Sequence, residues 1–309
     1  YLLVKRLKIL RDIARNALEV TMETLGFIGL GNMGGAICRA LVDRGNQVTV
    51  YDLNEKAVSA FQGKARIAGD AVEVLEKSGI IFLSLPASRH VIPILEEYLT
   101  HGVKGKTVVD TSTSYPETTR AFYERFKEAG GSLVDLAISG APADAGKGGL
   151  MALFGGDEEE HEHLAPYVAC FANRYPNLGG SGNGHTAKIL FNFVAMTYVN
   201  IYAMAFPLAE KMGLDMHQLF ELLMTTGMGC GTMNFYVPKM IDRTYDMAFA
   251  LELAHKDLTY CRNLFEKFQV PAFALDGELA MLRTAIRDGK GKMDYSACIS
   301  TMFEFFEGK

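Results

Sequence analysis

The sequence predicts an α/β domain built on a doubly wound Rossmann-type sheet, followed by an all-helical domain. Two observations predict this class. Short apolar runs alternate with helical patterns through the first half of the chain, which is typical of consecutive βαβ units. The second half shows helical periodicity and few strand signals. We therefore expect a peripheral extension at residues 1–21, a dinucleotide-binding domain at 22–183 and a helical substrate or oligomerisation domain at 184–309.

The first βαβ unit carries a glycine-rich turn. We expect a strand over 26–30, a helix over 32–44 and a second strand over 47–51. Glycines at the turn permit a sharp reversal, a close approach of the backbone to a pyrophosphate, and tight packing of helix on strand. The N-terminus of the helix then faces the phosphates with unpaired N–H groups. The residues expected to hold the dinucleotide here are Gly29, Leu30, Gly31, Asn32, Met33 and Gly34.

Asp52 closes the second strand and indicates which dinucleotide binds. A carboxylate at this place accepts hydrogen bonds from the adenosine ribose hydroxyls and repels a 2′-phosphate. The next residues are Leu53, Asn54 and Glu55, so no arginine follows that would hold such a phosphate. We expect NAD rather than NADP.

Further strands are expected over 80–85, 107–110, 132–135 and 150–154. In doubly wound sheets, ligands bind at the carboxyl ends of the parallel strands. For Ser112 and Thr113, residue type alone leaves a ligand contact and ordinary loop chemistry equally open. The residues at these strand ends are Leu85, Pro86, Ser112, Thr113, Ser139 and Gly140.

The second half opens with a long apolar helix, expected over 185–212. Lys188 is the single charge between Arg174 and Glu210, and it shares a helical face with Asn192 four residues on. The apolar run 186–209 approaches the length of a membrane span. Its internal lysine, two asparagines and proline instead favour a helix buried on most sides in a soluble protein. Further helices are expected over 216–225, 246–268 and 272–288.

Composition excludes several classes of protein. The net charge of −5 and the lack of a basic stripe argue against nucleic acid as a partner. Five widely spaced cysteines without a CxxC favour a reducing compartment, and we expect a cytoplasmic protein. The sequence HEH at 161–163 lacks metal-site spacing, so we expect an exposed acidic helix start and no metal. The basic, amphipathic residues 1–21 resemble either a presequence or a peripheral extension, and we prefer the extension.

Seven stretches together resemble the β-hydroxyacid dehydrogenases, the group of 3-hydroxyisobutyrate dehydrogenase and tartronate semialdehyde reductase. The resemblance covers about residues 23–300 and is specific as a set. The stretches are GFIGLGNMG (26–34), SLP (84–86), DTSTSYPETTR (110–120), DLAISGAPADAGKGGLMALFGG (135–156), GNGHTAKILFN (182–192), LAHKDL (253–258) and DYSA (294–297).

The resemblance implies a role for each matching residue. Lys188 would be the catalytic general acid/base, and Asn192 would help to hold the substrate. Lys256 would lie near the nicotinamide, although Lys256 and Asp257 also read as a solvated charge pair. Leu85, Pro86 and Thr113 would line the cofactor, and Ser139, Gly140 and Ala141 would contact the substrate. The partner implied is a small anionic substrate. The long apolar helix and the surplus of apolar residues in the second half separately predict a homo-oligomer, a dimer or a tetramer.

The chain departs from the family pattern in the substrate loop. Ala137 stands where the family has proline, and Ala141 stands where it has a second glycine. An alanine would be strained there if that backbone had a positive φ. Phe191 replaces a common asparagine. Arg89, Lys147 and His185 could bind an anion, but each reads more simply as a surface charge.

We expect a dehydrogenase of small 3-hydroxyacids or a reductase of their semialdehydes. The departures in the substrate loop leave a sulfonated or larger aldehyde acid open as the substrate. A related class, the imine reductases, generally lacks the lysine, and a phosphogluconate-type decarboxylating enzyme would be longer. A non-catalytic, NAD-sensing binding protein is the alternative from another class.

Overall fold

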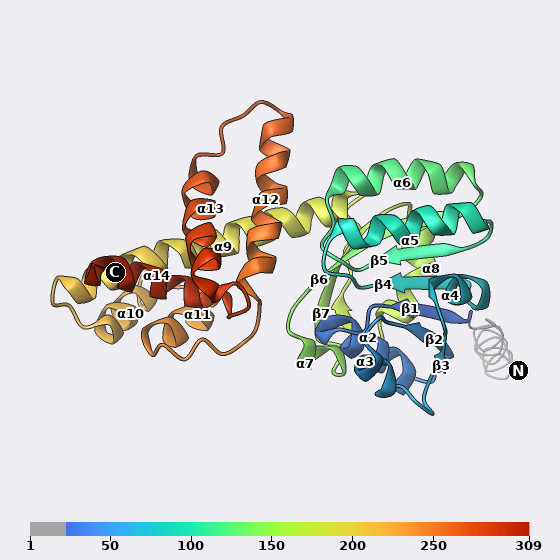
Figure 1. The fold of residues 1–309 in the computed structure, drawn as a ribbon, viewed down its shortest axis with the longest axis horizontal. Coiled ribbons are helices and arrows are strands. Elements are labelled where there is room, and N and C mark those ends of the chain that lie inside the picture. Colours follow the sequence, from blue (N-terminus) through green and yellow to red (C-terminus); the bar gives the residue numbers. More distant parts are fainter. Residues whose placement is uncertain (1–22, 309) are drawn as a thin grey trace, which may run out of the picture.

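The computed structural model describes residues 23–308, so the extension expected at 1–21 lies outside the described residues. An α/β domain and a helical domain lie side by side along the long axis of the molecule (Figure 1). A single helix, α9 (Asn183–Lys211), starts at the α/β domain and runs through the helical domain. The expected fold class is confirmed.

The α/β domain contains an eight-stranded sheet in the order β3-β2-β1-β4-β5-β6-β7-β8. The first six positions are parallel, as in doubly wound dinucleotide-binding sheets, whereas β7 runs antiparallel to β6. Two short strands, β3 and β8, were not expected, and β6 extends beyond residue 135 to Ser139. The strands are β1 (Leu25–Ile28), β2 (Val48–Tyr51), β3 (Arg66–Ile67), β4 (Ile80–Leu83), β5 (Thr107–Asp110), β6 (Ser132–Ser139), β7 (Leu150–Gly155) and β8 (Ala172–Arg174).

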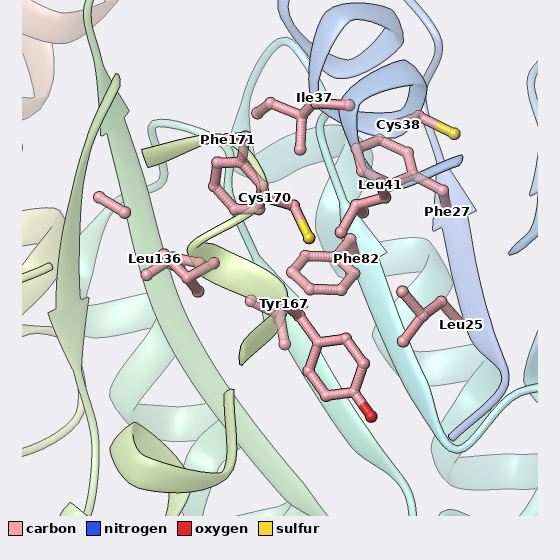
Figure 2. Close-up of a cluster of buried hydrophobic side chains, with 14 of the residues drawn as sticks. Leu25, Phe27, Ile37, Cys38, Leu41, Phe82, Leu136, Tyr167, Cys170 and Phe171 are labelled. Carbon is pink, nitrogen blue, oxygen red and sulfur yellow. The ribbon is translucent and has the colours of Figure 1, made fainter. Parts of the chain in front are cut away.

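Helices cover both faces of this sheet. One face packs against α2 and α8, in a core that includes Phe27, Phe82 and Phe171 (Figure 2). The other face packs against α4, α5 and α6 through a second cluster. Because both faces are covered, β1, β4 and β5 are buried along their whole length. The helices of this domain are α2 (Asn32–Asp43), α3 (Glu55–Ser59), α4 (Ala71–Lys77), α5 (Ser88–His101), α6 (Pro116–Glu128), α7 (Pro142–Ala145) and α8 (Glu158–Val168).

The helical domain packs around α9. Helices α11, α12 and α14 lie against it, and their apolar side chains form a third core. The sequence did not predict α11 or α14, and the helix expected from residue 246 begins only at Leu251. The elements are α10 (Met216–Met224), α11 (Gly231–Ile241), α12 (Leu251–Lys267), α13 (Phe273–Ala285), a π-turn at Ile286–Lys290, a 3-10 turn at Tyr295–Ala297 and α14 (Cys298–Glu307).

Helix α9 has two different apolar faces, which corrects the expectation of a helix buried on most sides. One face, which includes Ile189, Val199 and Phe206, is fully buried in the helical core. The opposite face stays open to solvent. In residues 23–308, α9 is the one helix long and apolar enough to cross a membrane, and 39% of its most apolar window is buried in the protein. The exposed large apolar residues of α9 are Leu190, Phe191, Val194, Tyr198, Ile201, Met204 and Leu208.

The start of α9 is fastened to the sheet by one buried side chain. Asp135 of β6 accepts hydrogen bonds from Gly182 N at 2.7 Å and from His185 N at 2.8 Å. Its carboxylate thus satisfies N–H groups that a helix leaves unpaired in its first turn. The two strands beneath, β6 and β7, pack directly on α9. A methyl group on Gly184 would lie 2.3 Å from Leu153 O and 2.9 Å from Asp135 Oδ2, so the contact requires a glycine.

We expect Gly184→Ala to destabilise the protein by roughly 1–3 kcal/mol, since the added methyl group overpacks a contact with backbone atoms. Urea unfolding measures the change. Gly277→Ala is the matched control, because Gly277 is exposed within α13 and a methyl group there meets nothing within 4 Å. The control should be neutral or stabilising by up to about 1 kcal/mol. Equal effects of the two substitutions would contradict the packing argument.

Candidate active site

The glycine turn between β1 and α2 has the geometry of a dinucleotide cradle. Gly29 has a φ of +94°, and a methyl group there would lie 2.2 Å from Ser84 O. Gly34 lies so close to the turn that a methyl group would be 2.0 Å from Gly29 O. A methyl group on Gly31 would meet nothing within 4 Å, so the space beside this residue is open. The turn therefore leaves room for a ligand at the N-terminus of α2. Leu30 is buried in it, Met33 is half-buried and Asn32 is exposed.

Asp52 lies at the carboxyl end of β2, beside this turn. Its carboxylate accepts hydrogen bonds from Leu30 N at 2.5 Å and from Asn54 N at 2.7 Å. It also lines a groove of about 370 Å³, together with Tyr51, Leu53, Glu55, Val58, Ser59, Gln62, Ile67, Ala68 and Gly69. The lining contains two carboxylates and no basic side chain. A bound adenosine ribose would therefore meet an acidic wall.

The loops after β4 and β5 meet a lysine from the helical domain. Lys256 Nζ, on α12, donates to Pro86 O at 2.9 Å and to Thr113 O at 2.9 Å. Leu85 N, next to Pro86, donates to Ser112 Oγ at 2.9 Å, so the two loops are also bonded to each other. The three residues expected to line the cofactor thus lie at the contact between the domains. Lys256 is the side chain that joins them to α12.

Behind this contact, a buried carboxylate links Lys256 to α9. Asp257 is 1% exposed, and its two oxygens lie 3.0 Å from Lys256 Nζ and 2.6 Å from Asn192 Nδ2. The reading of Lys256 and Asp257 as a solvated pair is therefore wrong. Sequence spacing could not show this, because the burial depends on how α12 packs against α9. Asn192 is itself 6% exposed, and its amide is fixed by Asp257.

Lys188 lies one turn before Asn192 and is partly buried. Burial lowers the pKa of its ammonium to about 8, against an opposing pull from Asp257 and a smaller push from Lys256. Its Nζ lies 5.5 Å from the centre of the Phe191 ring. A lysine with this pKa exists partly as a neutral amine near neutral pH, unlike a free lysine with a pKa of about 10.4. It can therefore accept or release a proton under ordinary conditions.

The expected substrate loop follows β6. Gly140 has a φ of +124°, which favours glycine at that position. Ala141 has a φ of −93°, so the strain considered for an alanine here does not arise. Ser139 is half-buried, and both following residues are exposed. Because β6 also packs against α9, the loop leaves the sheet from a strand that contacts the helix of Lys188.

His185, interpreted as a surface charge, is instead fully buried. Its Nδ1 is 2.8 Å from Thr119 Oγ1, and its Nε2 is 3.8 Å from Asp110 Oδ2. Asp110 in turn accepts hydrogen bonds from Ser112 N at 2.9 Å and from Ser114 Oγ at 2.7 Å. None of these contacts was expected. The available signal was an aspartate in each of two adjacent buried strands, at the end of β5 and in the middle of β6.

The acidic segment around HEH forms the start of α8, as expected. His161 stacks on Tyr175 with the ring centres 4.1 Å apart, so it is a packing residue. Within residues 23–308, no group of three or more His, Cys, Asp or Glu side chains is placed to hold a metal ion.

Replacing Asp257 tests the electrostatics around Lys188. Asp257 raises the pKa of Lys188, so Asp257→Asn should lower that pKa further below about 8. Competitive acetylation of Lys188 as a function of pH, followed by mass spectrometry, measures the shift. Glu266→Gln is the control, since Glu266 is an exposed carboxylate on the same helix. A pKa of Lys188 that rises or stays constant in Asp257→Asn would contradict the assignment.

Comparisons with known proteins agree with this geometry. A family model described as the NAD binding domain of 6-phosphogluconate dehydrogenase matches residues 24–180. A second, described as NAD-binding of NADP-dependent 3-hydroxyisobutyrate dehydrogenase, matches residues 182–302. The chain is 29% identical to 2-hydroxy-3-oxopropionate reductase of Escherichia coli K12, over 90% of this chain and 96% of the relative. It is 28% identical to 3-sulfolactaldehyde reductase of the same organism, over 90% and 95%.

Among solved structures, 3-hydroxyisobutyrate dehydrogenase of Mycobacterium tuberculosis, solved with L-serine, superposes with a TM-score of 0.84. That likeness covers 91% of this chain and 99% of the other at 24% identity, and it shows a shared fold. The two family models lie end to end across nearly the whole described chain, with their junction at the start of α9. The chain belongs to the 3-hydroxyisobutyrate dehydrogenase-like family of hydroxyacid dehydrogenases with NAD(P)-binding domains.

Proposed function

We propose that this protein is an NAD-dependent dehydrogenase of a small 3-hydroxyacid, or a reductase of the corresponding semialdehyde, with Lys188 as general acid/base. The observation that carries the proposal is a lysine with a pKa of about 8 at the junction of a dinucleotide-binding domain and a helical domain. Perturbed ionisable groups in such junctions are typical of catalytic sites. An NAD-sensing protein without turnover would have no use for this lysine.

The residues present fit a nicotinamide dinucleotide. The open space beside Gly31 and the free N–H groups of α2 suit a pyrophosphate. The groove beside Asp52 suits the adenosine. The loops that contain Leu85, Pro86 and Thr113 would then hold the nicotinamide end, with Lys256 behind them. When bound, the nicotinamide supplies an acceptor or donor of hydride at its C4 atom.

The protein's own residues would then handle the proton and the substrate. During oxidation, neutral Lys188 Nζ accepts the hydroxyl proton as hydride leaves the carbinol carbon, and during reduction the ammonium returns that proton to the carbonyl oxygen. Asn192, one turn after Lys188 and held by Asp257, would hydrogen-bond the same substrate. Ser139, Gly140 and Ala141 would bind the acid group.

Position 141 bears on the identity of the acid group of the substrate. The methyl group of Ala141 is compatible with its backbone and adds bulk where the family has glycine. This change alters the shape of the expected acid-group site, and one relative is named for a sulfonated aldehyde. We therefore propose two substrate candidates, a carboxylate such as 3-hydroxyisobutyrate or tartronate semialdehyde, and a sulfonate. Steady-state rates on a panel of these compounds with both cofactors distinguish them.

Replacement of Lys188 tests the chemical role. We expect Lys188→Ala to lower kcat by roughly 10²–10⁴-fold, the usual contribution of a general acid/base. In the wild type, kcat/KM for oxidation should rise with pH through about 8, because the base form of Lys188 is required. Lys211→Ala, at the other end of α9, is the control and should keep full activity. Normal kcat in Lys188→Ala, or a flat profile between pH 7 and pH 10, would refute the role.

The cofactor preference depends on Asp52. We expect a higher kcat/KM with NAD than with NADP, and Asp52→Asn should reduce the ratio of the two values at least ~10-fold, about 1.4 kcal/mol. Asparagine keeps an acceptor oxygen for Leu30 N and removes the charge that repels a phosphate. Asp43→Asn, exposed at the end of α2, is the control. A wild-type enzyme that prefers NADP would overturn this part of the proposal.

We also propose that the exposed face of α9 binds a second copy of the chain, giving a dimer or a tetramer. Leu190, Val194, Tyr198, Ile201 and Leu208 are each 45–53% exposed and follow a helical spacing. No charged side chain interrupts this stripe. Exposed Leu222 on α10 and Phe235 on α11 add apolar surface in the same domain. Large apolar patches of this kind mark protein interfaces, and a symmetric interface uses the same patch twice.

Sedimentation analysis tests the assembly. The wild type should sediment as a dimer or a larger oligomer at micromolar concentration. The double substitution Val194→Glu with Ile201→Glu should shift the population toward monomer, because it buries two carboxylates in the interface. Leu53→Glu is the control, since Leu53 is 89% exposed and lies in the other domain. A monomeric wild type, or an unchanged mass in the double variant, would disprove the interface.

A further inference from the structure

A circuit of polar contacts leaves the helix of Lys188 at Asn192 and returns to it at His185. From Asn192 it passes to Asp257 and Lys256 of α12. Lys256 then bonds the carbonyls of Pro86 and Thr113. The return path runs through the two loops to Asp110, whose Oδ2 lies 3.8 Å from Nε2 of His185 at the start of α9, beyond hydrogen-bond distance. Lys188 lies between the two ends, one turn from each.

His185 occupies the place in this circuit where two buried carboxylates meet. Asp110 and Asp135 are register partners on the parallel strands β5 and β6, so they project on the same face of the sheet. They are 2% and 0% exposed. Burial raises the pKa of the Asp135 carboxyl, while His185 opposes that rise. Two such groups side by side need a nearby donor or positive charge.

The groups around the imidazole come from four elements. Asp110 faces it from β5, and Asp135 from β6, where the Asp135 carboxylate bonds the backbone N–H of His185. From α6, Thr119 is 2.8 Å from Nδ1, and the next residue, Arg120, bonds Ser181 O and Glu117. Lys188 is the charge on α9 itself. His185 thus bonds the anchor of α9 through its backbone N–H, and its imidazole lies against Thr119 of α6 and Asp110 of β5.

We propose that His185 is a positioning residue for Lys188, because it couples the first turn of α9 to the loop after β5 and so fixes the lysine relative to the cofactor loops. This inference rests on the proposed function, since it concerns the group proposed to carry the proton. It requires no contact between His185 and substrate. A misplacement of about 1 Å in a reacting group can cost up to about 10²-fold in rate.

Two substitutions of His185 distinguish a positioning role from a general effect on the stability of the protein. His185→Leu fills a similar volume with an apolar side chain but removes the imidazole that lies among Thr119, Asp110 and Asp135. We expect kcat to fall roughly 10–100-fold, with KM for NAD within about 3-fold of wild type. We also expect the pKa of Lys188 to rise from about 8 as water reaches the displaced ammonium. His185→Gln, which can donate to Asp110 and bond Thr119, should keep both values near wild type.

Leu164→Ala is the control for lost stability, because Leu164 is fully buried on α8 in the core of the opposite sheet face. It should lower Tm without changing kcat or the pKa of Lys188. If His185→Leu does not fold, Thr119→Val replaces it, with an expected fall in kcat of a few-fold. The inference is overturned if His185→Leu, or Thr119→Val in its place, leaves kcat and the pKa of Lys188 unchanged. It is equally overturned if Leu164→Ala reproduces the changes.

Competitive acetylation of Lys188 gives a readout that does not depend on turnover. If the wild type oxidises no hydroxyacid with either cofactor, the proposed function fails. The pKa of Lys188 in the His185 variants still decides the positioning role. A raised pKa in His185→Leu and an unchanged pKa in His185→Gln support the inference in that case, and equal values in all three proteins refute it.

Discussion

The architecture of the site depends on one buried carboxylate. Asp135 takes the first N–H groups of α9 into the sheet and so fixes where a 29-residue helix begins and in which direction it runs. Everything that the helix carries, including Lys188, Asn192 and the core of the helical domain, is placed by that contact. Gly155 and Gly184 pack so closely on it that a methyl group on either would lie within 3 Å of a carboxylate oxygen. An anchor made this tightly leaves little freedom for the lysine.

The second constraint on the site is the ion pair between Lys256 and Asp257, which acts from α12 in the helical domain. Lys256 reaches across the domain boundary to two backbone carbonyls, while its neighbour Asp257 holds the amide of Asn192. The charge of this carboxylate also limits how far burial lowers the pKa of Lys188. The position of Lys188 and its pKa are thus set by the same few side chains. A substitution in this group should alter both properties together, as is usual in connected polar networks.

Much of the fold could be predicted from the sequence because the relevant signals are local. The glycine turn, the acid that closes β2 and the alternation of strands and helices depend on residues close in sequence. The buried state of Asp257 and His185 depends instead on contacts between elements 65 and 66 residues apart. The hydrophobic periodicity of a sequence does not indicate such long-range contacts. The backbone conformation of Ala141 could not be predicted either, because its φ of −93° depends on how the loop leaves β6.

Continuity of α9 has a mechanical consequence. Helix α9 runs unbroken over 29 residues, about 44 Å at 1.5 Å per residue, so Lys188 near its start is joined by one continuous helix to the helical domain. Left-handed glycines at 179 and 182 precede the helix, and the N–H of Gly182 is itself held by Asp135. A displacement of the helical domain would therefore be transmitted to the amine along the helix, because no joint within the helix could absorb it.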